Sequence, residues 1–210
     1  MIKILIADDH AIVREGLKQI VVETSDMVVA DEASTGHEVL DKVRHNEYTV
    51  VVLDISMPGG DGLNILKQIK REKHKLPVLV LSVHSEEQYA VRALRAGAAG
   101  YLTKESAPSE LILAIRRVSG GRKYISPLLA EKLAFDLESG REKPYHETLS
   151  DREYQVMCMI ASGKRVKEIS EELCLSVKTI STYRSRILEK MRMNNNAELT
   201  HYAIKHGLVE

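Results

Sequence analysis

The sequence has few cysteines, no long apolar run and no net charge, and each of these shortages excludes a class of protein. Its two cysteines, Cys158 and Cys174, have no second pair nearby, so neither a disulfide framework nor a zinc cluster is expected. Both are instead predicted to be buried thiols. No apolar run approaches the roughly 18 to 20 residues that a bilayer span requires, and the N-terminus lacks the cleavage region of a signal peptide. A cytoplasmic protein without a membrane partner is therefore expected.

Although 30 basic residues balance 30 acidic ones over the 210 residues, the charges are unevenly spread. Residues 1–118 hold 15 basic and 17 acidic residues, residues 119–148 hold 5 of each, and residues 149–210 hold 10 and 8. These small excesses give no part of the chain a strong polyelectrolyte character. Residues 176–192, however, contain five basic side chains and one glutamate, which marks a candidate interaction patch.

The first half of the chain alternates short apolar runs, rich in β-branched residues, with segments of helical spacing. The runs are residues 4–7, 28–30, 50–53, 78–81 and 100–102. Because they lack the alternation of a half-exposed strand, they are typical of a parallel sheet covered on both faces. A fifth helical segment follows Pro108 and Ser109 and ends near Val118. Residues 1–118 are therefore predicted to form an α/β, doubly wound (βα)5 domain with a flavodoxin-like fold.

The second half is predicted to be all-α. Ser119-Gly120-Gly121 interrupts the alternation, and we interpret residues 119–148 as a linker that contains one helix, over residues 127–139. Residues 149–210 carry no strand signal and fit four helices, over residues 151–161, 166–173, 177–191 and 197–206. The three-residue break between the second and third of these helices is typical of a helix-turn-helix, although most such helix pairs are plain structural corners.

Polar side chains follow the predicted strands at the edge where open α/β sheets bind their ligands. Asp8 and Asp9 follow the first strand, Asp54 the third and Ser82 the fourth, and Lys104 stands shortly after the fifth. If the sheet has the flavodoxin-like strand order 2-1-3-4-5, the first and third strands are neighbours, and three carboxylates share one crevice. Such a cluster repels unless a cation lies within it, and its oxygen ligands suit Mg²⁺. For any single acid, a helix N-cap is the competing interpretation.

Short motifs in both halves of the chain extend this pattern. Those of the first half read ADDH at residues 7–10, LDISMPGGDG at 53–62, LSVH at 81–84 and GYLTK at 100–104. Those of the second half read LSDRE at 149–153, KEISEEL at 167–173, LSVKTI at 175–180 and NNAEL at 195–199. On these motifs, residues 1–118 resemble the receiver domain of a two-component response regulator. Residues 149–210 resemble the helix-turn-helix DNA-binding domain of the NarL/FixJ (LuxR-type) class, so the resemblance covers nearly the whole chain.

The resemblance implies that Asp54 accepts a phosphoryl group from a histidine of a sensor kinase. It also implies that Asp8, Asp9, Asp54 and the main-chain carbonyl of Ser56 hold Mg²⁺. The chain then catalyses only its own phosphorylation and slow self-dephosphorylation, and it is not otherwise an enzyme. The alternative is a Mg²⁺-dependent phosphatase with an aspartyl-phosphate intermediate, but its general acid would stand at Ser56 and is missing. His10 adjoins this set, yet no two histidines have metal-ligand spacing, and all eight are expected to be surface or structural residues.

The same resemblance assigns switching roles to three residues. Lys104 pairs with the phosphoryl oxygens, Ser82 moves toward them, and Tyr101 occupies the aromatic position that repacks once Ser82 has moved. A plain core tyrosine is the alternative at position 101. Many receivers carry proline directly after the lysine, whereas Glu105 stands here, so no cis proline is predicted at that point. A degenerate receiver that works without phosphorylation is disfavoured because the acidic residues, the serine and the lysine are all present.

The resemblance makes residues 177–191 the DNA-recognition helix, and a helical wheel agrees with that role. The apolar side, which must pack on the rest of the domain, carries Ile180, Ile187, Leu188 and Met191. The residues predicted to contact DNA are Lys178, Thr179, Ser181, Thr182, Ser185 and Arg186. Cations attract phosphates, and hydroxyls and Arg reach base edges in a major groove. An ordinary solvated helix face is the alternative, and Ser181, where relatives often carry lysine, indicates a different target sequence.

The implied partners are a sensor histidine kinase, double-stranded promoter DNA and, in the phosphorylated form, a second copy of the chain. The homodimer is expected to use the surface near the fourth helix, fifth strand and fifth helix, where Tyr101 and Lys104 lie. Release of the output domain, with residues 119–148 as a hinge, is a second route to activation. RNA polymerase is a further candidate partner of a regulator of this class.

Overall fold

The computed structural model describes residues 1–57, 62–83, 86–127, 129–131, 134 and 144–209. The chain forms two compact units, Met1–Glu131 and Lys132–Glu210. Within the described ranges, no helix has both the length and the apolar character that a membrane crossing requires. The predicted linker helix over residues 127–139 lies mostly outside the described residues, as do residues 58–61 and 84 of the receiver motifs.

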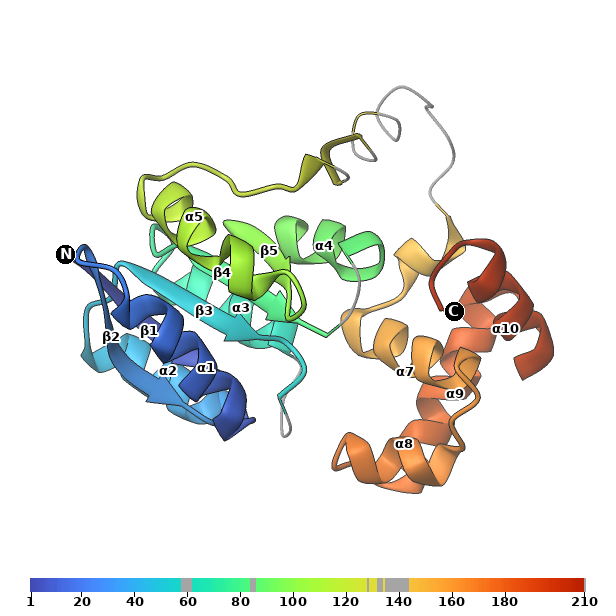
Figure 1. Cartoon of the computed structure of the whole chain (residues 1–210). Helices are drawn as coiled ribbons and strands as arrows, with labels where there is room; N and C mark the ends of the chain where they lie inside the picture. The colour runs from blue at the N-terminus through green and yellow to red at the C-terminus, as the bar shows by residue number, and fades with distance from the viewer. Residues whose placement is uncertain (58–61, 84–85, 128, 132–133, 135–143, 210) are drawn as a thin grey trace. The chain divides into compact units, whose positions relative to one another are not determined.

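The first unit is built on a five-stranded parallel sheet (Figure 1). Its strands are β1 (Ile2–Ala7), β2 (Met27–Ala33), β3 (Val50–Asp54), β4 (Val78–Ser82) and β5 (Gly100–Thr103). Their spatial order is β2-β1-β3-β4-β5, which confirms the predicted flavodoxin-like topology. The second strand is longer than the apolar run at residues 28–30 because its pairing with β1 extends to Ala33.

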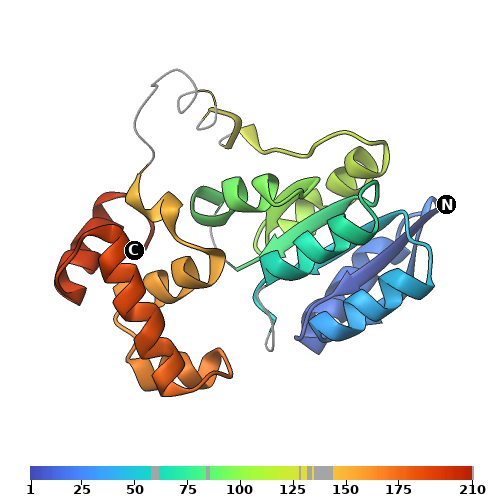
Figure 2. The same cartoon turned by 180° about the vertical axis from the view of Figure 1, so that it is seen from behind.

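A helix follows each of the five strands, and together the helices cover both faces of the sheet. They are α1 (Ala11–Val22), α2 (Gly36–His45), α3 (Gly62–Glu72), α4 (Glu86–Arg95) and α5 (Ala107–Ser119). Helices α1 and α5 lie on one face, at the front in Figure 1, and α2 and α3 lie on the other, at the front in Figure 2. Every residue of β3 and β4 is buried as a result, which explains why these strands do not alternate apolar with polar residues.

The first unit continues beyond Val118, because the chain after α5 packs on the β5 edge of the sheet. The Tyr124 N–H donates to the Ala99 carbonyl at 2.9 Å, and Tyr124 forms a parallel bridge with Gly100 of β5. A Cβ on Gly100 would lie 2.8 Å from the Cβ of Tyr124, so this close approach requires glycine. The Tyr124 ring joins the hydrophobic core, and its hydroxyl donates to Glu110 of α5 at 2.7 Å.

The same segment reaches helix α4. The Ser126 hydroxyl donates to the Glu86 carboxylate of α4 and accepts from the Leu129 N–H at 3.1 Å. Leu129 itself is buried. Residues 122–127 therefore cross the exposed edge of β5 from α5 to α4, and we name them the strap.

The second unit is all-α within its described residues. A short 3₁₀ helix, η1 (Tyr145–Thr148), precedes α7 (Asp151–Ala161), α8 (Val166–Glu172), α9 (Val177–Met191) and α10 (Asn196–Lys205). The last four agree with the predicted helices to within one residue at each end. Their shared core is formed by buried apolar residues that include Tyr154, Ile169, Ile187 and Leu199, one from each helix.

The turn between α8 and α9 corrects one prediction about the cysteines. Cys158 is buried on α7, as predicted, but Cys174 is exposed. Leu173 takes the buried position before the turn, and the chain then reverses at Cys174, whose φ of 52° is left-handed. The reversal directs the thiol toward solvent. The prediction of a buried thiol treats Cys174 as part of an amphipathic segment and therefore misses this reversal.

Candidate functional site

The structure brings the predicted acidic residues together at the carboxyl ends of β1 and β3. Asp8 and Asp9 directly follow β1, and Asp54 is the last residue of β3. Because Ala7 pairs with Leu53 in the register of these adjacent strands, Asp8 and Asp54 stand side by side. Both are fully buried, whereas 25% of the Asp9 side chain is exposed.

Lys104 lies between two of these carboxylates. Its ammonium is 2.7 Å from Oδ2 of Asp8 and 2.8 Å from Oδ2 of Asp54. The other oxygen of Asp54, Oδ1, accepts from the Ser56 N–H at 2.7 Å. Burial lowers the pKa of Lys104, but its hydrogen bonds with Asp54 and Asp8 outweigh burial, so the net pKa is raised and the ammonium stays charged.

The site is nevertheless short of positive charge. Burial raises the pKa of Asp54, and the hydrogen bonds from Lys104 and the Ser56 N–H offset only part of this effect, while Asp8 adds repulsion. Donor atoms of Asp8, Asp9, Asp54 and His10 all lie within 4.8 Å of one another. A tight set of oxygen donors with uncompensated negative charge fits a divalent cation such as Mg²⁺.

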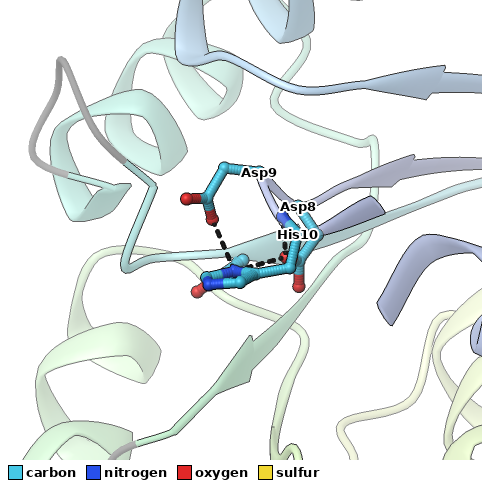
Figure 3. A group of neighbouring side chains, drawn as sticks. Asp8, Asp9 and His10 are labelled. Carbon is cyan, nitrogen blue, oxygen red and sulfur yellow. Dashed lines mark hydrogen bonds and ion pairs between the residues drawn. The ribbon is translucent and has the colours of Figure 1, made fainter. Parts of the chain in front are cut away.

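His10 joins this cluster, a placement that the spacing of the histidines does not predict. Its Nδ1 lies 3.0 Å from Oδ1 of Asp9 and 3.3 Å from Oδ1 of Asp8 (Figure 3). The His10 N–H donates to the same Asp8 oxygen at 2.8 Å, and the Arg14 guanidinium donates to the Asp8 carbonyl at 2.8 Å. The only signal in the sequence is that His10 directly follows Asp8 and Asp9. The turn from β1 into α1 brings its side chain back onto these two carboxylates.

Ser82 and Tyr101 lie on the next two strands of the sheet. Leu81 pairs with Asp54 across β4 and β3, so Ser82 stands one residue further along, and it is fully buried. Tyr101 of β5 is also buried, and burial raises the pKa of its hydroxyl, an effect that a hydrogen bond with Ser82 partly offsets. The main-chain N–H of Lys104 donates to the Ser82 carbonyl at 2.7 Å. The lysine, the serine and the tyrosine are thus connected.

In the second unit, helix α9 has one buried and one exposed face. Of the residues that the helical wheel places on the packed side, Ile180, Ile187 and Met191 are buried and Leu188 is half-buried. The exposed residues among those predicted to contact DNA are Lys178, Ser181, Thr182, Ser185 and Arg186. Thr179 is half-buried, and its hydroxyl lies 2.7 Å from that of Ser176, the N-cap residue, so Thr179 is engaged in the helix start.

The hydroxyls on the exposed face are hydrogen-bonded within the helix. Ser181, Thr182 and Ser185 each donate to the carbonyl four residues earlier, at 2.9, 2.9 and 3.1 Å. A hydroxyl that donates in this way keeps lone pairs directed outward. The face therefore presents hydrogen-bond acceptors, which suit the amino groups of adenine and cytosine in a major groove.

The five basic residues at 176–192 differ in what they contact. Three are engaged inside the unit: Lys190 with Glu153 at 2.6 Å, Arg184 with Asn196 at 2.7 Å and Arg192 over the Tyr145 ring at 5.7 Å. Within the described part of the chain, Lys178 and Arg186 have no ion-pair partner and are exposed. Their charges are therefore available to bind an external anion such as a phosphate.

Two family models match the chain. The response regulator receiver domain matches residues 4–116, and the luxR family of bacterial regulatory proteins matches residues 147–203. The chain belongs to the response regulators. The first match covers the sheet and the carboxylate cluster of this response regulator, and the second covers helices α7 to α9 and most of α10.

Known relatives of the response regulator extend over its full length. The response regulator UvrY of Escherichia coli (strain K12) is 41% identical over 209 residues, which make up 99% of this chain and 96% of UvrY. A structure of the RcsB response regulator from Salmonella typhimurium is 27% identical with a TM-score of 0.71, and the match covers 98% of each chain. RcsB from Salmonella enterica serovar Typhimurium, solved on the promoter rprA with the phosphomimetic BeF3⁻, is 28% identical with a TM-score of 0.66, over 96% of this chain and 98% of that one.

One buried carboxylate ties α9 of the response regulator to α7. Glu153 of α7 is 3% exposed, accepts from the Ser150 N–H at 2.8 Å in a capping box and accepts from the Lys190 ammonium at 2.6 Å. Burial raises the pKa of Glu153, but the hydrogen bonds from Lys190 and Ser150 outweigh burial, so its net pKa is lowered. The ion pair fixes the last turns of α9 against the start of α7.

We expect Glu153→Gln to destabilise the second unit by about 1 to 3 kcal/mol at neutral pH, because the neutral amide loses the charged hydrogen bond to Lys190. Since the folded-state pKa of Glu153 is lowered, its contribution is present above the unfolded-state pKa of roughly 4.3 and is lost as pH falls through the folded-state value. Urea unfolding from about pH 7 down to about pH 3 measures this. The gap between wild type and variant should close at low pH, and Glu189→Gln, an exposed control on α9, should show no gap. A gap that is independent of pH would contradict the assignment.

Proposed function

We propose that the chain is a cytoplasmic transcription regulator that binds promoter DNA and is switched by phosphorylation of Asp54. The observation that carries the proposal is the Lys104 ammonium held between the buried carboxylates of Asp8 and Asp54, in a chain whose second part matches the luxR family. RcsB, a structural relative, is solved on a promoter with a phosphomimetic. The proposal takes residues 1–118 as the receiver domain, 149–210 as the DNA-binding domain and 119–148 as the linker, whose first part, up to Glu131, belongs to the compact first unit.

Asp54 is the proposed phosphoryl acceptor. One of its carboxylate oxygens attacks the phosphorus of a phosphohistidine on the sensor kinase, and the bond from phosphorus to the histidine nitrogen breaks, leaving its electron pair on that nitrogen. Lys104, 2.8 Å from the acceptor, then pairs with the phosphoryl oxygens. Asp8, Asp9, Asp54 and the Ser56 carbonyl would hold Mg²⁺, which offsets charge on the transferring group when bound.

A phosphatase is the weaker candidate for the same site. Ser56 occupies the position where such an enzyme needs a carboxylic acid, and a serine hydroxyl is too weak an acid for that task. The Ser56 N–H is moreover committed to Asp54. The aspartyl phosphate is therefore expected to hydrolyse slowly. Slow hydrolysis suits a signalling protein better than a phosphatase, which must turn over its substrate.

Asp54→Asn should abolish phosphoryl incorporation from acetyl phosphate or from a kinase, because the amide is nearly isosteric but is a poor nucleophile. Intact-mass spectrometry measures the incorporation. Removing Mg²⁺ with a chelator should block the wild-type reaction as well. Asp41→Asn, which changes an exposed carboxylate on α2, is the matched control and should still incorporate phosphate. An undiminished gain of one phosphoryl group in Asp54→Asn would place the acceptor elsewhere.

Helix α9 is the proposed reader of DNA. Lys178 and Arg186 are exposed without an ion-pair partner among the described residues, so they are assigned to phosphates. Thr182 and Ser185, whose hydroxyls present acceptors, are assigned to base edges, with Ser181 beside them. A dimer should favour two inverted half-sites spaced by about one helical turn or a multiple of it.

Lys178→Ala or Arg186→Ala should weaken binding to many sequences and reduce the slope of log K against log salt by roughly one unit for each lost phosphate contact. Thr182→Val or Ser185→Ala should instead change the preference among sites, by about 1 to 3 kcal/mol for a lost base contact. Anisotropy titrations at several salt concentrations separate the two effects. Lys205→Ala, at an exposed lysine of α10, is the control. Four variants with unchanged affinity and site preference would show that α9 does not read DNA.

Phosphorylation is proposed to promote dimerisation through the surface of α4, β5 and α5. The strap lies across this surface, because Tyr124 binds Glu110 of α5 and Ser126 binds Glu86 of α4. A partner chain that docks there therefore requires the strap to move. Tyr101 lies on β5, and the charge of Glu86, the α4 residue that binds the strap, raises the pKa of the Tyr101 hydroxyl in addition to burial.

Ser126→Ala should therefore shift the unphosphorylated chain toward the dimer, because the strap loses its bond to α4. Sedimentation equilibrium measures the dimerisation constant, with and without BeF3⁻. Ser34→Ala is the matched control, since Ser34 also donates its hydroxyl to a glutamate, Glu38, but near β2 and α2. An unchanged constant in Ser126→Ala, together with hydrogen-exchange protection of the strap that persists in the BeF3⁻ dimer, would show that the dimer forms elsewhere.

A further inference from the structure

His10 lies inside the cluster that the proposed function assigns to a cation, and that function makes no use of it. The side chain is 60% exposed, yet its Nδ1 faces the cluster, 3.0 Å from Oδ1 of Asp9 and 3.3 Å from Oδ1 of Asp8 (Figure 3). His10 is the N-cap residue of α1, but its side chain makes no capping hydrogen bond. Its ring is therefore not needed to start the helix.

The distances around His10 match those between neighbouring ligands of one ion. Two adjacent donors, each about 2.1 Å from an ion in octahedral geometry, lie ~3 Å apart. The two contacts of Nδ1 have this length, and the donor atoms of His10, Asp8, Asp9 and Asp54 are all within 4.8 Å of one another. Nδ1 is thus close enough to the three carboxylates to share one ion with them.

The main chain around His10 is held in place for this role. The His10 N–H donates to Oδ1 of Asp8 at 2.8 Å, and Arg14 from the first turn of α1 donates to the Asp8 carbonyl at 2.8 Å. These bonds fix the residue that carries the ring relative to the carboxylates. Because the ring is exposed, it has room to adjust its position on ligation.

We propose that His10 supplies a nitrogen ligand to the divalent cation and thereby shifts the preference of the site from Mg²⁺ toward transition metals such as Mn²⁺. The inference rests on the proposed function, because it takes the carboxylate cluster as a cation site. Imidazole nitrogen suits first-row transition metals, whereas Mg²⁺ prefers oxygen ligands and retains its waters. The cation preference of this response regulator is then set by a residue outside the acidic set.

The test compares full-length wild type with His10→Ala at one fixed pH. Mn²⁺ binding is followed by the EPR signal of the free ion, and Mg²⁺ binding is measured by competition in the same titration. His10→Ala should weaken Mn²⁺ binding roughly tenfold while changing Mg²⁺ binding much less. Pulsed EPR of the Mn²⁺-bound wild type should show a ¹⁴N coupling that the variant lacks. His45→Ala is the matched control, because Nδ1 of this exposed histidine lies 3.3 Å from the Asp41 carboxylate on α2.

Asp9→Asn separates this inference from the proposed function. The substitution should weaken the binding of both cations, and any Mn²⁺ that still binds should keep its ¹⁴N coupling. A wild type that binds neither cation would overturn the cation site and the role of His10 together. A wild type without ¹⁴N coupling, whose ratio of Mn²⁺ to Mg²⁺ affinity is unchanged in His10→Ala, would overturn the role of His10 alone. So would a variant that binds both cations more tightly, because the ring would then be a competitor of the ion.

Discussion

Three carboxylates meet one ammonium at the carboxyl ends of β1 and β3, and this shortage of positive charge governs the chemistry of the first unit. Lys104 bridges Asp8 and Asp54 at 2.7 and 2.8 Å, yet burial still raises the pKa of Asp54. A buried carboxylate whose negative charge is incompletely compensated favours the binding of a cation. The strands hold the carboxylates together at this electrostatic cost, because the parallel register fixes where each strand ends.

The same register connects the site to a distant surface. Ser82 and Tyr101 follow on β4 and β5, and Tyr101 is within the electrostatic reach of Glu86 on α4. Glu86 in turn accepts from Ser126 of the strap. Between Asp54 and the edge of β5, where the strap lies, the residues are thus related by strand register and hydrogen bonds and, from Tyr101 to Glu86, by charge alone.

The basic residues of α9 fall into two groups, those that contact other helices of the second unit and those that are exposed. Lys190 is held by Glu153, and Arg184 is held by Asn196, so both serve the packing of α9. Lys178 and Arg186 are exposed on the opposite face with the hydroxyls of α9. A rigid helix with a free polar face is what a groove-reading element requires, because side chains that are already positioned lose less conformational freedom on binding.

The sequence by itself determined the alternation of strands and helices in the first unit, the four helices of the second unit and the positions of Asp8, Asp9 and Asp54 at strand ends, because apolar periodicity and strand ends are local properties of a chain. Helical periodicity also singled out Lys178 and Arg186 among the five basic residues at 176–192, and the structure added the partners that Lys190, Arg184 and Arg192 contact. Tertiary structure alone decided that Cys174 faces solvent, that Tyr124 and Ser126 extend the first unit past Val118, and that His10 joins the carboxylates. The first and third depend on the backbone conformation of a turn, which apolar periodicity does not reveal. The second depends on contacts between residues that the sequence keeps apart.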